Sequence, residues 1–273
     1  MSIKIALAGM PPIALAGIRF AIGGSVVLLW AAANGVTLRM SRSDRRALGS
    51  LAVLFLAQIL LLNEGTHHTL ASRSTLMIST YPFFTALFAH LFIPGDRLTK
   101  MKVAGMTLSL VGVALLFAEG LEMREFSYLL GDLMVLGSAI LLGGRQVYTK
   151  RLTQNIHPYK LLVWQAALSL PLFAILSASL ESDVTYQFTA EVAIAIAYQG
   201  LVIAGFCFIV FVSLLRRYSA SRLGVFGFFT PVFGVLASRF LLGDRLSPLL
   251  IGSMLLVGAG IAIVNWQERD RPD

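Results

Sequence analysis

Long apolar blocks separated by short polar connections run through the whole chain, and this pattern predicts a bundle of membrane-spanning helices. About 20 apolar residues cross a hydrocarbon core of about 30 Å, because each helical residue rises about 1.5 Å. The blocks lack the alternation of a transmembrane β-barrel and the narrow apolar stripe of an amphipathic helix. The pattern predicts nine complete spans: Pro12–Ala33, Ala47–Leu62, Ala71–Ile93, Val103–Ala118, Asp132–Leu152, Leu161–Leu180, Val192–Leu215, Leu223–Leu242 and Leu249–Val264.

Composition agrees with a membrane protein. The chain is 57% hydrophobic and 13% charged, whereas soluble domains are about 45–50% apolar and about 25% charged. A formal charge of +8 would suggest nucleic acid in a soluble protein. Here the basic residues lie at the ends of predicted spans, which excludes a nucleic-acid-binding face. The lone Cys207 lies in an apolar run, so no internal disulfide is expected.

Basic residues gather in alternate connections, and these predict the orientation in the membrane. Short loops rich in Lys and Arg stay in the cytoplasm, so this set and the C-terminus are expected to face inward, in a multi-pass protein of the cell inner membrane. The opposite connections are acidic, with Glu119, Glu122 and Glu125 in one and Glu181, Asp183 and Glu191 in another. The basic set comprises Arg39, Arg42, Arg45, Arg46, Arg97, Lys100, Lys102, Lys150, Arg151, Lys160, Arg216, Arg217 and Arg222.

An internal repeat divides the chain into residues 1–127 and 128–273 of one transmembrane domain. The sequence Gly95–Leu98 (GDRL) recurs as Gly243–Leu246, each after an aromatic span that contains a proline. Pro12 with Arg19 has a counterpart at the same spacing in Pro158 with Gln165. The charge pattern places the first GDRL turn inside and the second outside, so the repeats are expected to be inverted, as in many secondary transporters.

These motifs, in their order and spacing, resemble the EamA family of the drug/metabolite transporter superfamily over nearly the whole chain. The resemblance rests on Lys4–Leu7 with Pro11-Pro12 and Arg19-Phe20, Tyr81-Pro82, Gly95–Leu98, Gly105 through Gly112, Gly131-Asp132, Thr230-Pro231, Gly243–Leu246 and Gly252. It implies ten helices in two inverted five-helix repeats, and export of metabolites, often amino acids, through a central cavity. Many members carry Glu where Asp96 and Asp244 stand here.

The family pattern implies a further helix before Pro11. Ser2–Gly9 would reach only about 12 Å as a helix, less than half of the hydrocarbon core. We therefore expect the first helix to be truncated in this chain, through a misplaced start site, which leaves nine full spans.

Polar side chains inside the predicted spans are the candidate substrate-binding groups, because such groups are costly in a bilayer. Arg145 would hold a substrate carboxylate, or would extend toward the cytoplasmic edge near Lys150. Arg19 and Gln165 would frame a cavity or satisfy backbone groups where helices cross. The full candidate set is Arg145, Tyr148, Trp164, Gln165, Tyr81, Tyr198 and Gln199; the last two would otherwise anchor an interface.

His67 and His68 lie between two spans on the predicted outer side, with Glu64 nearby. Adjacent histidines on a helix point about 100° apart, so the spacing favours no metal site. The two histidines would instead couple export to protons, or belong to an ordinary polar loop.

Pro82 and Pro231 fall inside their spans, where each would kink a helix and serve as a hinge for alternating access. The small residues Gly105, Ser109 and Gly112 are expected to allow close helix packing. Asp132 is expected at an outer helix end, which leaves no central carboxylate of the kind that couples proton antiport.

The sequence contains no HExxH, GxSxG, P-loop or dinucleotide-binding motif, so neither an enzyme nor an ATP-driven pump is expected, and no cofactor. The sequence favours a secondary transporter that exports a small metabolite, amino-acid-like or otherwise amphiphilic, by alternating access. A lipid or nucleotide-sugar carrier of the same superfamily and an inactive truncated transporter are the alternatives. The expected partners are the metabolite and the lipid bilayer, and a homodimer stays open.

Overall fold

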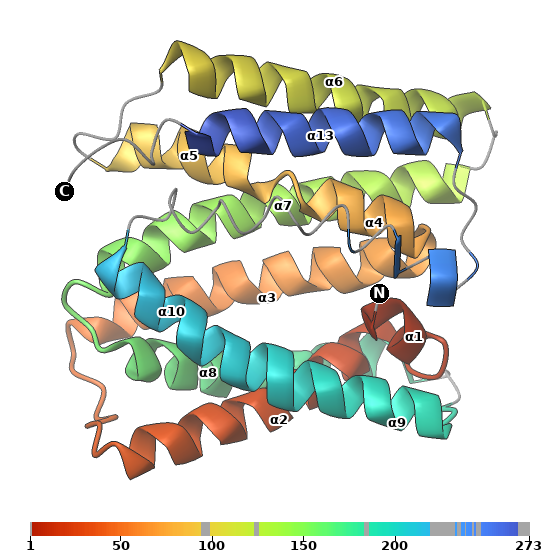
Figure 1. The fold of residues 1–273 in the computed structure, drawn as a ribbon. Helices are drawn as coiled ribbons and strands as arrows, with labels where there is room; N and C mark the ends of the chain where they lie inside the picture. Colours follow the sequence, from red (N-terminus) through yellow and green to blue (C-terminus); the bar gives the residue numbers. More distant parts are fainter. Residues whose placement is uncertain are drawn as a thin grey trace. The chain divides into compact units, whose positions relative to one another are not determined.

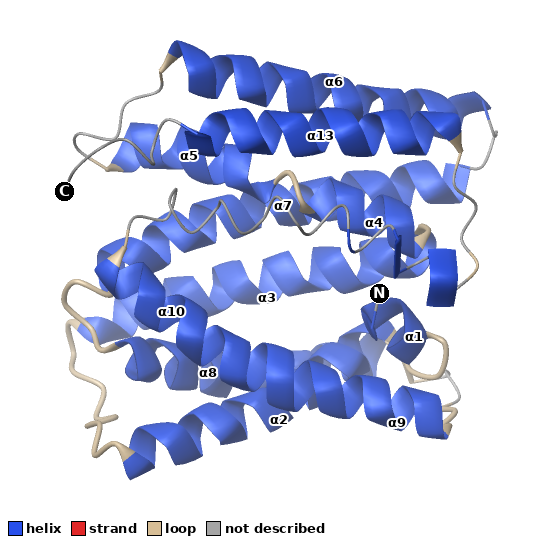
Figure 2. Cartoon of the chain, in the orientation of Figure 1, coloured by secondary structure: helices blue, strands red, loops and turns tan. Residues whose placement is uncertain are grey.

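The computed structural model describes residues 2–93, 99–122, 126–182, 186–218 and 247–266, with isolated positions between 233 and 243. Within these ranges the chain is helical and contains no strand (Figures 1 and 2). The helices are α1 (Ser2–Leu7), α2 (Pro12–Ala33), α3 (Asp44–His68), α4 (Ala71–Ile78), α5 (Tyr81–Phe92), α6 (Lys100–Glu122), α7 (Phe126–Leu152), α8 (Pro158–Leu180), α9 (Ala190–Ala197), a π-helical segment (Tyr198–Cys207), α10 (Phe208–Arg217) and α13 (Pro248–Trp266).

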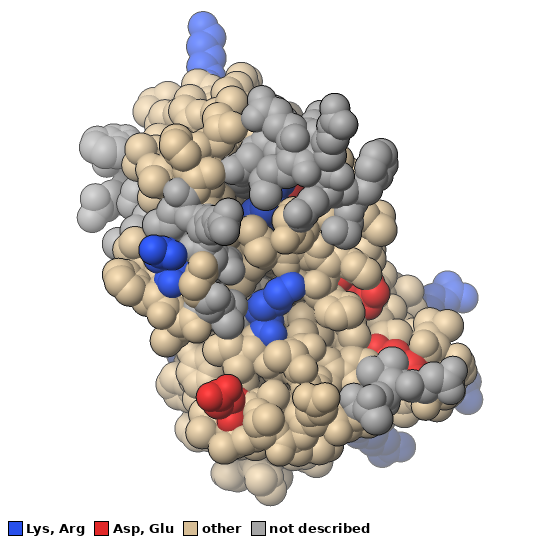
Figure 3. Space-filling view, turned by 90° about the vertical axis from the view of Figure 1, so that its right-hand side faces the viewer, with Lys and Arg blue, Asp and Glu red and all other residues tan. Residues whose placement is uncertain are grey.

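Six described segments are long and apolar enough to cross a membrane, which confirms the polytopic helical class. Two further predicted spans correspond to shorter apolar helices, Val103–Leu115 and Pro248–Ile263. The predicted span Leu223–Leu242 lies mostly outside the described residues, as do Pro231 and both GDRL turns apart from Gly243. On the face that Figure 3 shows, most described atoms belong to uncharged residues, and the charged side chains form separate small groups.

The chain divides into two compact units. One, called here the Arg19 unit, comprises Ser2–Asn63 and Tyr148–Arg217; the other, the Asp132 unit, comprises Glu64–Val147 and Tyr218–Asp273. Each unit combines residues from both halves of the chain, and the repeat boundaries at 1–127 and 128–273 stay a prediction.

Aromatic packing builds the centre of the Arg19 unit. Phe20 of α2 lies edge-on to Phe55 of α3 with ring centroids 4.6 Å apart, and it stacks on Phe173 of α8 at 6.3 Å. Phe55 and Phe173 are fully buried. Edge-to-face and offset pairs of this kind add to the burial of the rings themselves, so they fix α2 against α3 and α8.

Small residues bring α6 and α13 together in the Asp132 unit, where the two helices run side by side (Figure 1). A Cβ on Gly112 would lie 3.0 Å from the Ser253 carbonyl oxygen, and Ser109 Oγ donates to the Val257 carbonyl at 3.2 Å. The prediction that Ser109 and Gly112 serve close helix packing is therefore confirmed.

Candidate functional site

A buried arginine–glutamine pair lies in the apolar interior of the Arg19 unit. Arg19 on α2 is 4% exposed, and its Nη1 donates to Gln199 Oε1 at 3.0 Å. Among the described residues, Arg19 Nε has no hydrogen-bond partner. Gln199 is itself buried and donates from Nε2 to Ser2 Oγ. The structure thus joins a predicted site residue, Gln199, to an arginine 180 positions away.

The π-helical segment presents Gln199 to α2. A Cβ on Gly23 of α2 would lie 2.5 Å from Ala204 Cβ, and one on Gly200 would lie 2.7 Å from Ile22 Cβ. Only glycines allow the backbones to approach this closely, so the contact fixes Gln199 opposite Arg19. Helices with i→i+5 hydrogen bonds are rare in proteins as a whole, and those that occur are often found at functional sites. Tyr198, by contrast, is 47% exposed and does not join the pair.

Glu181 holds the N-terminus of α2. Its Oε1 accepts from Ile13 N at 2.7 Å and its Oε2 from Ala14 N at 2.9 Å, while Ser177 Oγ donates to Oε2 at 2.8 Å. A carboxylate at this position satisfies unpaired N–H groups and interacts favourably with the helix dipole. The sequence placed Glu181 in an acidic outer loop. The available signal was Pro11, which occupies the N-cap position without any side-chain cap and so requires a distant acceptor.

Gln165 and Arg19 occupy equivalent positions in packed helices. Pro12 and Pro158 each begin their helix, and α2 packs against α8. Gln165 is 4% exposed. Arg19 and Gln165 are therefore both buried polar side chains, each at the same number of residues from the first residue of its helix.

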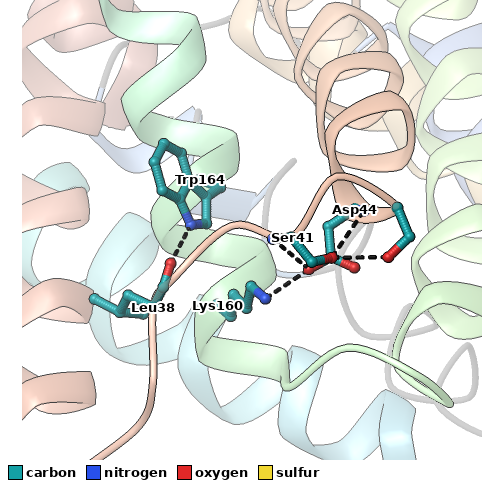
Figure 4. A network of polar contacts seen from close by, with 6 residues as sticks. Leu38, Ser41, Asp44, Lys160 and Trp164 are labelled. Carbon is teal, nitrogen blue, oxygen red and sulfur yellow. Dashed lines mark hydrogen bonds and ion pairs between the residues drawn. The ribbon is translucent and has the colours of Figure 1, made fainter.

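Trp164 and Tyr148 contact the α2–α3 connection and the first turns of α3. Trp164 Nε1 donates to the Leu38 carbonyl at 2.7 Å, and the Tyr148 hydroxyl lies 2.7 Å from Ser50 Oγ. Beside Trp164, Lys160 Nζ pairs with Asp44 Oδ2 at 2.6 Å (Figure 4). These contacts position α8 against the start of α3, at the end of the unit predicted to face the cytoplasm.

A buried ion pair in the Asp132 unit was missed by the sequence reasoning. Arg73 on α4 and Asp132 on α7 have side chains 2% and 0% exposed. Arg73 Nε donates to Asp132 Oδ2 at 2.9 Å, Nη2 also donates to Oδ2, and Thr69 Oγ1 donates to Oδ1 at 2.8 Å. The placement of Asp132 at a helix end was wrong, because α7 begins at Phe126. Arg73 lay inside a predicted span, so the rule that selected Arg145 would have found it.

Tyr81, Gln146 and Thr85 lie together between α5 and α7. Thr85 Oγ1 donates to Gln146 Oε1 at 3.4 Å, and the Tyr81 side chain hydrogen-bonds Gln146. Gly143 permits this contact, since a Cβ there would lie 2.7 Å from Thr85 N. Arg145, the neighbour of Gln146, is half-buried.

The span predicted at Ala71–Ile93 is interrupted at Ser79-Thr80, where α4 ends and α5 begins. Pro82 occupies the first turn of α5. A proline cannot donate to the carbonyl four residues earlier, and its ring clashes with that carbonyl. The helix is therefore interrupted just before Pro82, whose ring would otherwise clash with the carbonyl group of Ile78. Its use as a hinge, and that of Pro231, stay predictions.

Glu64, His67 and His68 converge at the end of α3. His68 Nε2 lies 3.1 Å from Glu64 Oε1, and the two imidazole centroids are 5.2 Å apart. One ligand atom from each of the three residues lies within 4.8 Å of the others. The sequence placed Glu64 near the two histidines but favoured no metal site, because adjacent histidines diverge on a helix; in the structure Glu64, one turn before His68, lies within reach of both.

Comparison with known proteins identifies the family. The model of the EamA-like transporter family matches residues 1–118 and 129–266. The "Uncharacterized transporter YvbV" of Bacillus subtilis is 27% identical, with 97% of this chain and 86% of the relative covered. The "Probable amino-acid metabolite efflux pump" of Salmonella typhimurium is 28% identical, with 96% and 88% covered.

A solved crystal structure shares the fold, with a TM-score of 0.73 at 22% identity and coverage of 96% of this chain and 91% of the other. The family match covers most of the chain, and its relatives carry the names of transporters. The chain therefore belongs to the EamA-like transporter family of the drug/metabolite transporter superfamily, and it is an integral membrane transporter.

Proposed function

We propose that the protein exports a small amino-acid-like metabolite across the inner membrane by alternating access, with its C-terminus in the cytoplasm. The observation that carries the proposal is Arg19, a buried guanidinium whose Nη1 is held by Gln199 while its Nε has no partner among the described residues. An arginine inside a membrane helix is costly and marks a substrate pathway by default.

The chemistry of this pair fits a carboxylate. A guanidinium presents a planar fork of N–H donors that binds a carboxylate bidentately. Gln199 orients one arm of the fork and leaves the other donors of Arg19 available to a ligand. Gln199 also offers an amide that can hydrogen-bond an adjacent polar group of the substrate. A carboxylate would supply the countercharge that Arg19 lacks within the described part of the Arg19 unit.

The relative from Salmonella typhimurium, named a "Probable amino-acid metabolite efflux pump", supports this substrate class. The distribution of Lys and Arg supports the orientation, because short basic connections stay on the cytoplasmic side. Breaks and close glycine contacts, such as those at Ser79-Thr80 and at Gly23, are suited to helices that rock against one another.

The test is survival of an exporter-deficient bacterial host on toxic levels of amino acids, purines and organic cations, with efflux measured from loaded cells. We expect protection against one class of amino-acid-like compound. Arg19→Met should abolish efflux, and Arg19→Lys should lower it by about 10–100-fold, since a hydrogen bond to a charged group contributes about 1.5–3 kcal/mol.

Arg39→Met is the matched control, because Arg39 is exposed in the α2–α3 connection; its efflux should equal that of wild type. Arg145→Met, measured beside Arg19→Met, decides which arginine binds the substrate. Full efflux by a folded Arg19→Met protein would refute the proposed role of Arg19. Export of lipids or nucleotide sugars without export of amino acids would refute the proposed substrate class.

A further inference from the structure

Two histidines and a glutamate meet on the last turn of α3, at the edge of the Asp132 unit. Glu64 and His68 are one turn apart with side chains 38% and 37% exposed, and His67 is exposed beside them. We infer that Glu64, His67 and His68 form a binding site for a divalent transition-metal ion of the Zn²⁺ class. This site involves no residue of the proposed substrate site, so the inference stands independently of the proposed function.

The distances fit such an ion. Zn²⁺ bonds nitrogen and oxygen at about 2.0–2.1 Å in tetrahedral geometry, which places neighbouring ligand atoms about 3.3 Å apart. His68 Nε2 and Glu64 Oε1 are already 3.1 Å apart. An ion can therefore replace the proton that they share, with little movement of either side chain.

His67 supplies the third ligand. Its nitrogen lies within 4.8 Å of the other two ligand atoms, and its exposed ring can turn about its side-chain bonds to close the remaining distance. Three protein ligands leave the fourth position to water, as in open zinc sites. The histidine pair thus contributes two ligands even though its Cβ atoms point in different directions.

The ligand set also selects the kind of ion. Imidazole nitrogens with one carboxylate suit Zn²⁺, Cu²⁺ or Ni²⁺, whereas Mg²⁺ and Ca²⁺ prefer oxygen ligands alone. The site lies at the C-terminus of α3, which ends at His68. The negative end of the helix dipole favours a cation there.

The site is connected directly to the buried ion pair of the same unit. Thr69, the residue after His68, donates to Asp132, which pairs with Arg73. Gly65, the residue after Glu64, faces α7 so closely that a Cβ would lie 2.8 Å from the Gly131 carbonyl oxygen. An ion that joins Glu64 to His67 and His68 would fix this turn of α3 against α7 and stabilise the folded protein.

The test uses the purified full-length transporter in detergent, carrying an affinity tag without histidines and freed of metal by chelation. ZnCl₂ is added, and binding is measured by isothermal titration calorimetry alongside the melting temperature. We expect saturable binding of one ion per chain and a higher melting temperature with Zn²⁺, but neither with MgCl₂. The visible absorption of bound Co²⁺ would report its coordination by nitrogen and oxygen.

Two variants test the assignment of the ligands. His68→Ala removes one ligand, and Glu64→Gln keeps the shape of the side chain and its contact with His68 but removes the charge. Each should weaken Zn²⁺ binding by at least about tenfold, because even changes outside the first coordination shell cost 10–100-fold. His90→Ala is the control, since His90 is an exposed histidine on α5 outside the cluster, and it should bind Zn²⁺ as wild type does.

Absence of saturable Zn²⁺ binding by the wild-type protein would overturn the inference. Unchanged affinity in both His68→Ala and Glu64→Gln would do the same, because the ion would then be held elsewhere. Since Glu64→Gln preserves the size and hydrogen bonding of the side chain, it keeps the test decisive if His68→Ala fails to fold.

Discussion

Asp132→Asn isolates the contribution of the buried ion pair to stability. Asparagine has the same shape as aspartate and keeps an oxygen that accepts from Thr69, but it removes the negative charge opposite Arg73. The guanidinium, 2% exposed, then loses the negative charge of Asp132. The variant therefore changes the electrostatics of the site and little of its packing.

The expected loss is large because neither partner can reach water. Removing one member of a buried ion pair typically costs 3–5 kcal/mol, since the remaining charge stays desolvated. A loss of 1 kcal/mol lowers the melting temperature of a chain of this size by about 2–4 °C. We therefore expect Asp132→Asn to melt about 6–20 °C below wild type.

The assay is thermal unfolding of the purified protein in one detergent, followed by fluorescence-detected size-exclusion chromatography. Asp44→Asn is the matched control, with the same chemical change in the more exposed pair that Asp44 forms with Lys160 at 2.6 Å, where side chains are 16% and 13% exposed. This pair is partly buried, and pairs nearer to solvent contribute less than fully buried ones, so this variant should melt closer to wild type than Asp132→Asn does.

A third variant separates the cost of an unpaired charge from the worth of the pair. Replacing Arg73 by Met together with Asp132 by Leu removes both charges, and exchanging a buried ion pair for apolar residues of similar volume is often neutral or stabilising. The double variant should recover most of the loss. If Asp132→Asn melts no lower than Asp44→Asn, or if the double variant is as unstable as the single one, the electrostatic explanation is wrong.

Two further predictions concern packing and pH. Gly260→Ala should destabilise the α6–α13 contact, because its Cβ would overlap Ser109 Oγ, whereas Gly252→Ala, with nothing within 4 Å of the new Cβ, should leave the melting temperature unchanged or slightly raised. His157 lies between two spans and accepts from Tyr159 N at 3.3 Å through Nδ1, and burial holds the pKa of its imidazole below the usual 6.5. The neutral form of His157 therefore stabilises the fold above pH 6.5, and this contribution should be lost as the pH falls below 6.5 through the lowered pKa. His157→Asn keeps a cap acceptor that does not titrate. Its melting temperature should therefore decrease less between pH 7 and 5 than that of wild type.

The hydrophobic pattern by itself determined the class of protein and most of its helices. The prediction for α2, Pro12–Ala33, matches the structure because an apolar block of this length must be helical in a bilayer and proline is favoured in the first helical turn. The order of the motifs also identified the family, which the match over both halves of the chain confirms.

Helix boundaries were less well determined wherever polar residues belong to a helix. The span predicted at Ala47–Leu62 runs from Asp44 to His68 in α3, and the one predicted at Val103–Ala118 runs from Lys100 to Glu122 in α6. Hydropathy marks the part of a helix that can cross the hydrocarbon, whereas backbone hydrogen bonding continues into the polar residues on either side.

Only the tertiary structure decided which polar side chains meet. The Arg19–Gln199 pair joins positions 180 residues apart, and Glu181 reaches the start of α2 across 168. Each partner alone has the signature of a buried polar residue, but the sequence does not say which helix faces which. That choice follows from close contacts such as Gly23 against Ala204, where the absence of a side chain lets two helices approach and sets the rotation of each. The sequence therefore supplied the candidate groups, and the packing of the helices determined how they are paired.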